Sequence, residues 1–219
     1  MMTNTDESPL VPLNKKEFER CAKISATEME RLDCFAALLC EWQQRMNLVS
    51  TSSLKDLWRR HMLDSVQLKN FIRDTDKTIL DLGSGAGFPG IVLGILMSGP
   101  RHTPIHLVES HGRKCTFLNE VARKTEANVV IHNTRIENLE PFPVDVVTAR
   151  ALAPLDKLLG YSAPFLAENS RCLFLKGLKS EQELTESRKK WTMIVTEAKS
   201  LSDASGVILT IERITRRHV

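Results

Sequence analysis

The segment from Asp81 to Gly90 reads Asp-Leu-Gly-Ser-Gly-Ala-Gly-Phe-Pro-Gly and combines an acid with four closely spaced glycines. Glycine permits positive φ and lets a ligand approach the main chain closely. A helix that begins after such a turn offers free N–H groups to polar or anionic ligand atoms. Glu109 lies nineteen residues after Gly90, near the spacing at which an acid binds the ribose of a nucleotide cofactor. These residue types predict a site for a nucleotide-containing ligand.

The spacing of the glycines supports two interpretations. Gly85-x-Gly87-x-x-Gly90 matches the GxGxxG pattern of dinucleotide-binding enzymes. Gly83-x-Gly85-x-Gly87 after Asp81 is instead the layout of S-adenosylmethionine-dependent methyltransferases. An acid at the end of the second strand holds ribose hydroxyls in both classes, so Glu109 does not separate them. A tight turn without a ligand is the third interpretation, and the residues alone leave all three open.

The elements that must position this segment alternate from residue 77 onward. Apolar runs predict strands at 78–82, 105–108, 128–132, 144–148 and 171–175, and helical periodicity predicts helices at 91–97, 113–124, 154–166 and 181–190. Pro164 predicts that the third of these helices ends early or kinks. Residues 193–195 and 207–211 suggest a terminal hairpin. Strands that alternate with helices predict an α/β fold with a doubly wound parallel sheet, which binds ligands at the carboxyl ends of its strands.

The first 75 residues or so show only helical periodicity. Apolar residues recur every three or four positions over 28–46, and Ser25 with Glu28 forms a candidate capping box. A second helix is expected to be capped by Ser53, with Leu57, His61 and Ser65 on one face. We therefore expect a helical segment before the sheet.

Composition limits the class of protein. The chain has 219 residues, of which 42% are hydrophobic and 26% charged, as in ordinary globular proteins. No apolar run approaches the ~20 residues of a spanning helix, and the first residues lack the layout of a signal peptide. The five cysteines contain no CxxC pair, so we expect reduced thiols, no metal site and a cytoplasmic location.

Basic residues are concentrated near the C-terminal end of the chain. Residues 171–219 carry ten Lys and Arg but six Asp and Glu, against a net charge of +3 for the whole chain. Such an excess suggests an anionic partner. The candidate phosphate contacts are Arg171, Lys176, Lys179, Arg188, Lys189, Lys190, Arg213, Arg216 and Arg217.

Taken together, these motifs identify a family resemblance. From about Trp42 to Lys176, the chain resembles the bacterial small-subunit ribosomal RNA guanine-N7 methyltransferases, known as RsmG or glucose-inhibited division protein B (GidB). Gly-Phe-Pro-Gly at 87–90 and His-x-Leu-Asp-Ser at 61–65 make the match specific. The Ser-Ala-Arg form common in the family is Thr148-Ala-Arg150 here. Further matching stretches are residues 45–49, 109–114, 135–137 and 175–177.

The resemblance implies a Rossmann-like class I methyltransferase sheet with an N-terminal helical extension. From the resemblance and the change of pattern at residue 77, we expect a flexible arm (1–13), the helical extension (14–76) and a methyltransferase domain (77–219). The implied cofactor is S-adenosylmethionine, and the implied partner is 16S ribosomal RNA or a small ribosomal subunit particle; we expect a monomer that does not bind membranes. The residues that match cofactor-binding positions of the family are Gly83, Phe88, Glu109, Ile136, Glu137 and Arg150.

The implied reaction needs no catalytic base. Guanine N7 carries an in-plane lone pair, so no proton has to leave before N7 attacks the methyl group, and we expect catalysis by placement and exclusion of water. His61, Asp64 and Ser65 resemble a hydrolytic triad only in composition, because no oxyanion hole is evident. The alternatives are a dinucleotide-dependent oxidoreductase and a non-catalytic RNA-binding or ribosome assembly factor on a methyltransferase fold. Methylation of a small molecule is a further variant that the chemistry leaves open.

Overall fold

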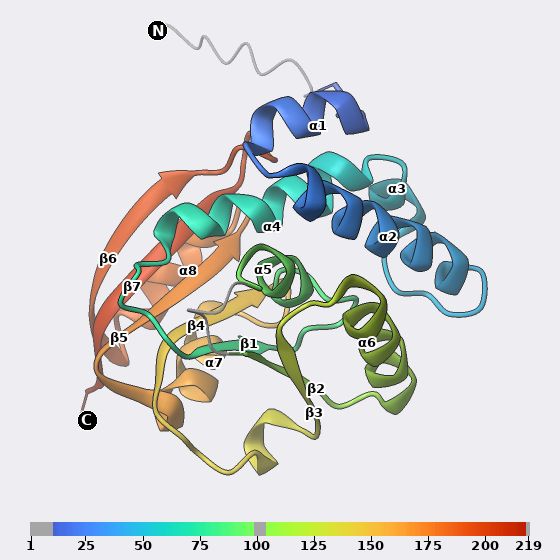
Figure 1. Ribbon diagram of the computed structural model, residues 1–219. Helices are drawn as coiled ribbons and strands as arrows, with labels where there is room; N and C mark the ends of the chain where they lie inside the picture. Colours follow the sequence, from blue (N-terminus) through green and yellow to red (C-terminus); the bar gives the residue numbers. More distant parts are fainter. Residues whose placement is uncertain (1–10, 99–103, 218–219) are drawn as a thin grey trace, which may run out of the picture.

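The computed structural model describes residues 11–98 and 104–217. A seven-stranded sheet lies at its centre, and helices cover both faces (Figure 1). The strands are β1 (Ile79–Leu82), β2 (Ile105–Glu109), β3 (Val129–Asn133), β4 (Val144–Arg150), β5 (Leu166–Lys176), β6 (Trp191–Lys199) and β7 (Val207–Arg216). The α-helices are α1 (Lys15–Ala22), α2 (Ala26–Gln43), α3 (Thr51–Leu54), α4 (Asp64–Val66), α5 (Gly90–Leu96), α6 (Gly112–Thr125), α7 (Leu155–Ser162) and α8 (Ser180–Ser187).

The strand order is β3-β2-β1-β4-β5-β7-β6. Strands β1 to β5 are parallel, whereas β7 pairs antiparallel with both β5 and β6. The doubly wound parallel sheet and the terminal hairpin are therefore confirmed. Helices α5 and α6 and the N-terminal helices lie on one face, and α7 and α8 lie on the other (Figure 1).

Strand β7 runs from the edge formed by the carboxyl ends of the parallel strands to the edge formed by their amino ends. The carboxyl ends of β1, β2, β3, β4 and β5 meet at one edge, where Lys176 of β5 pairs with Val207 at the start of β7. Strand β7 then runs back to the opposite edge, where Arg216 pairs with Trp191. The basic residues around 188–190 and 213–217 therefore lie at the edge away from the ligand-binding ends of the strands.

The N-terminal helices follow the sequence prediction with local differences. Ser25 and Glu28 form the predicted capping box of α2. This helix ends at Gln43 rather than residue 46, because the Gln43 side chain hydrogen-bonds the backbone of Leu48 and Val49 and turns the chain. Helix α1 lies within the predicted helical extension, although no separate helix was predicted at these residues, and its one buried residue is Phe18.

The expected second helix is instead a series of short pieces. Ser50, not Ser53, caps α3, because the Ser50 hydroxyl accepts the Ser53 N–H. A π-helix η1 (Trp58–Leu63) follows α3, and α4 then leads into a 3₁₀ turn, η2 (Gln67–Phe71). A π-turn widens the helix and often marks a functional site.

Further along the chain, β5 begins five residues before the predicted start at 171. Helix α7 ends at Ser162, and Pro164 lies in the following 3₁₀ turn, η4 (Ala163–Phe165). The predicted early end of this helix is confirmed.

The helices before β1 share one apolar core with the sheet. Leu32, Phe35 and Leu39 of α2 belong to the same buried cluster as Ile91 of α5 and Phe117 of α6. The boundary at residue 76 stays a prediction, and most of the predicted arm at 1–13 lies outside the described residues. Within the described ranges, no helix combines the length and the apolar character that crossing a membrane requires.

Candidate active site

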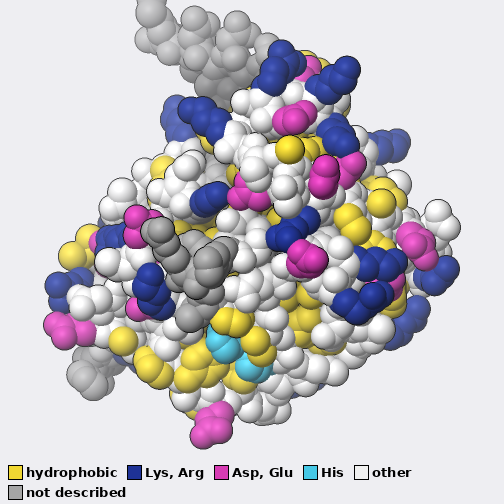
Figure 2. Space-filling model, in the orientation of Figure 1, with side chains coloured by type: hydrophobic (Ala, Val, Ile, Leu, Met, Phe, Trp, Pro, Cys, Tyr) yellow, Lys and Arg dark blue, Asp and Glu magenta, His cyan; other side chains and the backbone are white. Residues whose placement is uncertain are grey.

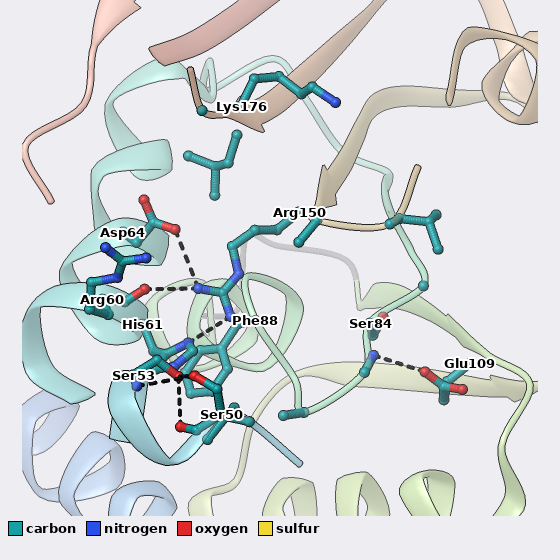
Figure 3. Close-up of a pocket in the computed structure, with 18 of the residues that line it drawn as sticks. Ser50, Ser53, Arg60, His61, Asp64, Ser84, Phe88, Glu109, Arg150 and Lys176 are labelled. Carbon is teal, nitrogen blue, oxygen red and sulfur yellow. Dashed lines mark hydrogen bonds and ion pairs between the residues drawn. The ribbon is translucent and has the colours of Figure 1, made fainter. Parts of the chain in front are cut away.

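A cavity of about 940 Å³ opens at the carboxyl edge of the sheet. Its walls come from the loops that follow β1 to β5, from residues 48–64 and from the β6–β7 loop (Figure 3). All six residues that sequence reasoning selected for cofactor binding line this one cavity: Gly83, Phe88, Glu109, Ile136, Glu137 and Arg150. Their individual roles stay predictions.

The glycine-rich loop needs glycine for its backbone conformation. Gly83, Gly85 and Gly87 have φ of +65°, +56° and +90°. Residues other than glycine rarely adopt such positive φ angles. A Cβ on Gly83 would lie 2.5 Å from Leu152 Cδ1, whereas one on Gly85 would meet only the Gly83 carbonyl, at 3.7 Å. The loop therefore turns tightly and leaves the cavity open at Gly85.

Glu109 joins this loop to the next one. One carboxylate oxygen accepts the Gly85 N–H at 2.9 Å, and the other accepts the His111 N–H at 2.8 Å. Glu109 is buried and lies beside the glycine-rich loop (Figure 3). Because each carboxylate oxygen has two lone pairs, the group retains acceptor capacity for hydroxyl donors in the cavity.

Asp81 lies in β1, directly before the glycine-rich loop. It is fully buried, and one oxygen accepts the Thr148 hydroxyl at 2.8 Å. Burial raises the pKa of Asp81 to about 6. A Cβ on Gly90 would lie 2.6 Å from the other Asp81 oxygen, so the last glycine of the GxGxxG pattern has a packing reason of its own.

Ile136 and Glu137 lie in a short 3₁₀ turn, η3 (Ile136–Asn138), directly after β3. Ile136 is partly buried and Glu137 is exposed. The pKa of Glu137 is lowered, first by its own backbone N–H and then by the side chain of Tyr161. The turn thus places an apolar side chain and an ionised carboxylate on the same wall of the cavity.

Arg150 connects the end of β4 to the helices before the sheet. Its guanidinium donates to the Arg60 carbonyl at 2.9 Å, to Asp64 Oδ2 at 3.3 Å and to His61 Nδ1 at 2.8 Å (Figure 3). It also lies 5.0 Å from the ring centroid of Phe88. The π-helix η1 contributes two of these acceptors, the Arg60 carbonyl and His61 Nδ1, and no sequence motif predicts these contacts.

His61 accepts this hydrogen bond as a neutral imidazole. Burial, together with the charges of Arg150 and Arg60, lowers the pKa of His61 to about 3. The ring packs 4.8 Å from the ring of Phe88, which stacks on Phe35 at the same distance. Phe88 is therefore a buried core aromatic that also forms part of the cavity wall.

The contacts do not form a hydrolytic triad. The Ser65 hydroxyl is buried and donates to the His61 carbonyl, not to the imidazole. Asp64 instead accepts from Ser202 at 2.6 Å with the oxygen that does not face Arg150. His61 thus contacts Arg150 at the end of β4, and Asp64 contacts the β6–β7 loop, while Ser65 faces the core.

Several of the basic residues expected to contact phosphate have other partners. Arg171 is buried in an ion pair with Asp76, which corrects its assignment as a phosphate contact. Lys176 is only partly exposed and pairs with Glu183 at 2.6 Å. Its ammonium also donates to the Ala153 carbonyl, so it fixes the loop after β4.

Sequence reasoning missed two parts of the wall. Residues 48–53 and the β6–β7 loop also line the cavity. The serines of the β6–β7 loop form no motif, because their placement depends on contacts with the distant residues Asp64 and Gln67. No cluster of three or more metal-ligand side chains occurs within the part of the chain that the structure covers.

Solved structures with a similar fold include a protein in complex with AdoMet and a ribosomal protein methylase. M. jannaschii TYW2 in complex with AdoMet superposes with a TM-score of 0.55 at 14% identity, over 80% of each chain. The ribosomal protein L11 methylase from Lactobacillus delbrueckii subsp. bulgaricus gives a TM-score of 0.51 at 19% identity, over 71% of this chain and 77% of that one. At these identities the likeness establishes the fold alone.

Sequence relatives are much closer. The Ribosomal RNA small subunit methyltransferase G of Paramagnetospirillum magneticum is 52% identical, over 88% of this chain and 92% of that protein. The protein of the same name from Rhodospirillum rubrum is 48% identical, over 93% and 100%. The GidB family model, rRNA small subunit methyltransferase G, matches residues 28–211. The glycine-rich loop, the acid after β2 and the arginine after β4 thus lie in a chain that belongs to the GidB family of rRNA small subunit methyltransferases.

Proposed function

We propose that this rRNA methyltransferase takes its methyl group from S-adenosylmethionine and transfers it to N7 of a guanine in 16S ribosomal RNA. The observation that carries the proposal is the link between Glu109 and the glycine-rich loop. A buried carboxylate, fixed by the Gly85 and His111 N–H groups, faces the same cavity as a loop whose Gly85 leaves open space. A carboxylate there suits a pair of ribose hydroxyls.

The other predicted residues fit the remaining parts of the same ligand. Ile136 and Glu137 form the wall expected to face the adenine. Gly83, Phe88 and Arg150 lie on the side where β1 and β4 end, which is the side expected to face the methionine part and the reacting methyl group.

The reaction itself is a single displacement. S-adenosylmethionine supplies a methyl group on a positively charged sulfur. The lone pair of guanine N7 forms the new N–C bond while the S–C bond breaks, so the positive charge passes to the guanine and no proton moves. The chain contributes placement and exclusion of water rather than a general base. Arg150 meets this need for rigidity, because three acceptors fix its guanidinium.

The dinucleotide interpretation has less support than S-adenosylmethionine. Family membership and the methyltransferase neighbours favour S-adenosylmethionine over a dinucleotide, and the packing of Gly90 against Asp81 explains the GxGxxG overlap without one. We further propose that the enzyme is a monomer and acts in the cytoplasm.

The test is a methyl-transfer assay with radiolabelled S-adenosylmethionine. The substrates are 16S ribosomal RNA and small-subunit particles from cells that lack the modification. Borohydride and aniline then cleave the labelled RNA at N7-methylguanine. Label with one discrete cut is the expected result. Label without a cut would move the methyl group to another atom, and absence of label on both substrates would contradict the proposal.

A further inference from the structure

Three cations on the rim of the cavity have no ion-pair partner among residues 11–98 and 104–217. They are Lys114 at the start of α6, Arg135 after β3 and Lys179 before α8. Arg135 and Lys179 are exposed, and Lys114 is partly exposed. The other cations on the wall are already neutralised, in the pairs Arg60–Asp203, Arg150–Asp64 and Lys176–Glu183.

The acids of the cavity leave this rim with excess positive charge. Glu109 accepts two neutral backbone N–H groups, which do not cancel its formal charge, and three other acids belong to the pairs just named. Glu109 and the exposed Glu137 therefore offset two of the three unpaired charges, which leaves the lining with an excess of one positive charge. Unpaired cations at the mouth of a cavity attract an anionic ligand that extends beyond the cavity.

Their placement indicates the shape of that ligand. Arg135 and Lys114 follow β3 and β2, whereas Lys179 follows β5. Four strand spacings separate β3 from β5 in the sheet order, which at about 4.8 Å each is about 19 Å. The glycine-rich loop follows β1, which lies between them. The three cations therefore flank the cavity on two sides.

We propose that Lys114, Arg135 and Lys179 bind backbone phosphates on the two sides of the target guanine, so that the RNA strand crosses the cavity mouth from the β3 side to the β5 side. This inference rests on the proposed function. A distance of about 19 Å spans several nucleotides at about 3.4 Å per nucleotide of stacked strand. A single-stranded segment with one base turned into the cavity fits this arrangement, because sequence-specific RNA recognition targets unpaired bases.

The same geometry excludes the C-terminal basic cluster from this track. Arg188 and Lys189 precede β6, and Arg217 follows β7, at the edge of the sheet opposite the cavity. Four of the cations at that edge already have partners: Lys189 with Glu186, Lys190 with Asp156, Arg213 with Glu168 and Arg216 with the ring of Trp191. On the face shown in Figure 2, basic side chains are interspersed with acidic ones.

The test compares two variants with the same loss of charge. The rim variant carries Lys114→Gln, Arg135→Gln and Lys179→Gln, and the control carries Arg188→Gln, Lys189→Gln and Arg217→Gln. RNA affinity is measured between 50 and 200 mM salt, together with the KM and kcat of methyl transfer. S-adenosylmethionine affinity and the melting temperature report whether each variant is folded.

Affinity falls as salt rises, and each single-strand phosphate contact adds about 0.7 to the steepness of log affinity against log salt. The slope of the rim variant is therefore expected to be shallower than that of the wild type by about 2. When salt is raised from 50 to 200 mM, the factor by which affinity falls should therefore be about 20 times smaller for the rim variant than for the wild type. KM should rise more than kcat falls, because these contacts hold substrate and transition state alike. The control should retain the wild-type slope.

Two outcomes overturn the inference. One is an unchanged slope in the rim variant, and the other is an equal loss of slope in the control. In both cases the wild type still methylates RNA, so the proposed function would stand. A wild type that binds no S-adenosylmethionine and transfers no methyl group would instead refute the proposed function.

Discussion

Replacing Glu109 by glutamine tests the link between the loop and the cofactor. The two carboxylate oxygens accept N–H groups from Gly85 and His111, at 2.9 and 2.8 Å. An amide oxygen can replace only one of them, and the new NH₂ group would face the other backbone N–H donor to donor. Because a hydrogen bond to a charged group contributes about 1.5–3 kcal/mol, Glu109→Gln should lower the free energy of unfolding by about 2 kcal/mol.

The same change should weaken cofactor binding separately from stability. If ribose hydroxyls donate to this carboxylate, loss of one charged acceptor should weaken binding of S-adenosylmethionine by about 10- to 150-fold. Isothermal titration calorimetry measures that constant, and urea denaturation measures stability. Glu140→Gln is the matched control, because Glu140 is exposed and lies outside the cavity lining. A Glu109→Gln variant that loses stability but binds S-adenosylmethionine within twofold of the wild type would show that Glu109 only shapes the loop.

Three further substitutions test other parts of the structure. Asp76→Asn leaves the Arg171 cation buried without its anion and should cost about 3–5 kcal/mol of unfolding free energy in denaturant titration; a loss below 1 kcal/mol would contradict the role of this pair. Burial raises the pKa of Asp81 from 3.8 to about 6, so protonation stabilises the fold at low pH and that stabilisation disappears as pH rises through 6. The stability of Asp81→Asn relative to the wild type should therefore increase by about 2 kcal/mol between pH 4 and 7, whereas a difference independent of pH would argue against the raised pKa. Asp64→Asn removes the counter-charge 3.3 Å from Arg150 and should reduce kcat/KM of methyl transfer by about 10- to 100-fold; full activity in the radiolabel assay would exclude this positioning role.

The parallel sheet could be predicted because its signals are local. Apolar runs of strand length alternate with helical periodicity from residue 77 onward, and the glycines require a turn between the first strand and its helix. The glycine-rich loop and Glu109 could be brought together on the same basis, since the carboxyl ends of parallel strands meet at one edge. Only the resemblance to a family assigned roles to Ile136 and Glu137, because a short turn after a strand has no chemical pattern of its own.

The features that could not be predicted from the sequence depend on contacts between residues far apart in the chain. The π-helix at Trp58–Leu63 interrupts a stretch with normal helical spacing, and its Arg60 carbonyl accepts from Arg150, ninety residues away. Arg171 looked like a phosphate ligand because its partner, Asp76, precedes it by 95 residues. The position of the C-terminal cations could be deduced only after the antiparallel direction of β7 was known.

The shared core of the N-terminal helices and the sheet has a consequence for modularity. Phe35 stacks on Phe88 of the glycine-rich loop, and Trp42 donates a hydrogen bond to Glu120 of α6. Deleting the first 76 residues would strip apolar side chains of α5 and α6 of their cover and leave Arg150 without its three acceptors. The extension is therefore not an interchangeable accessory, and a chimera that borrows it from another protein must also inherit the residues of the sheet domain that it touches.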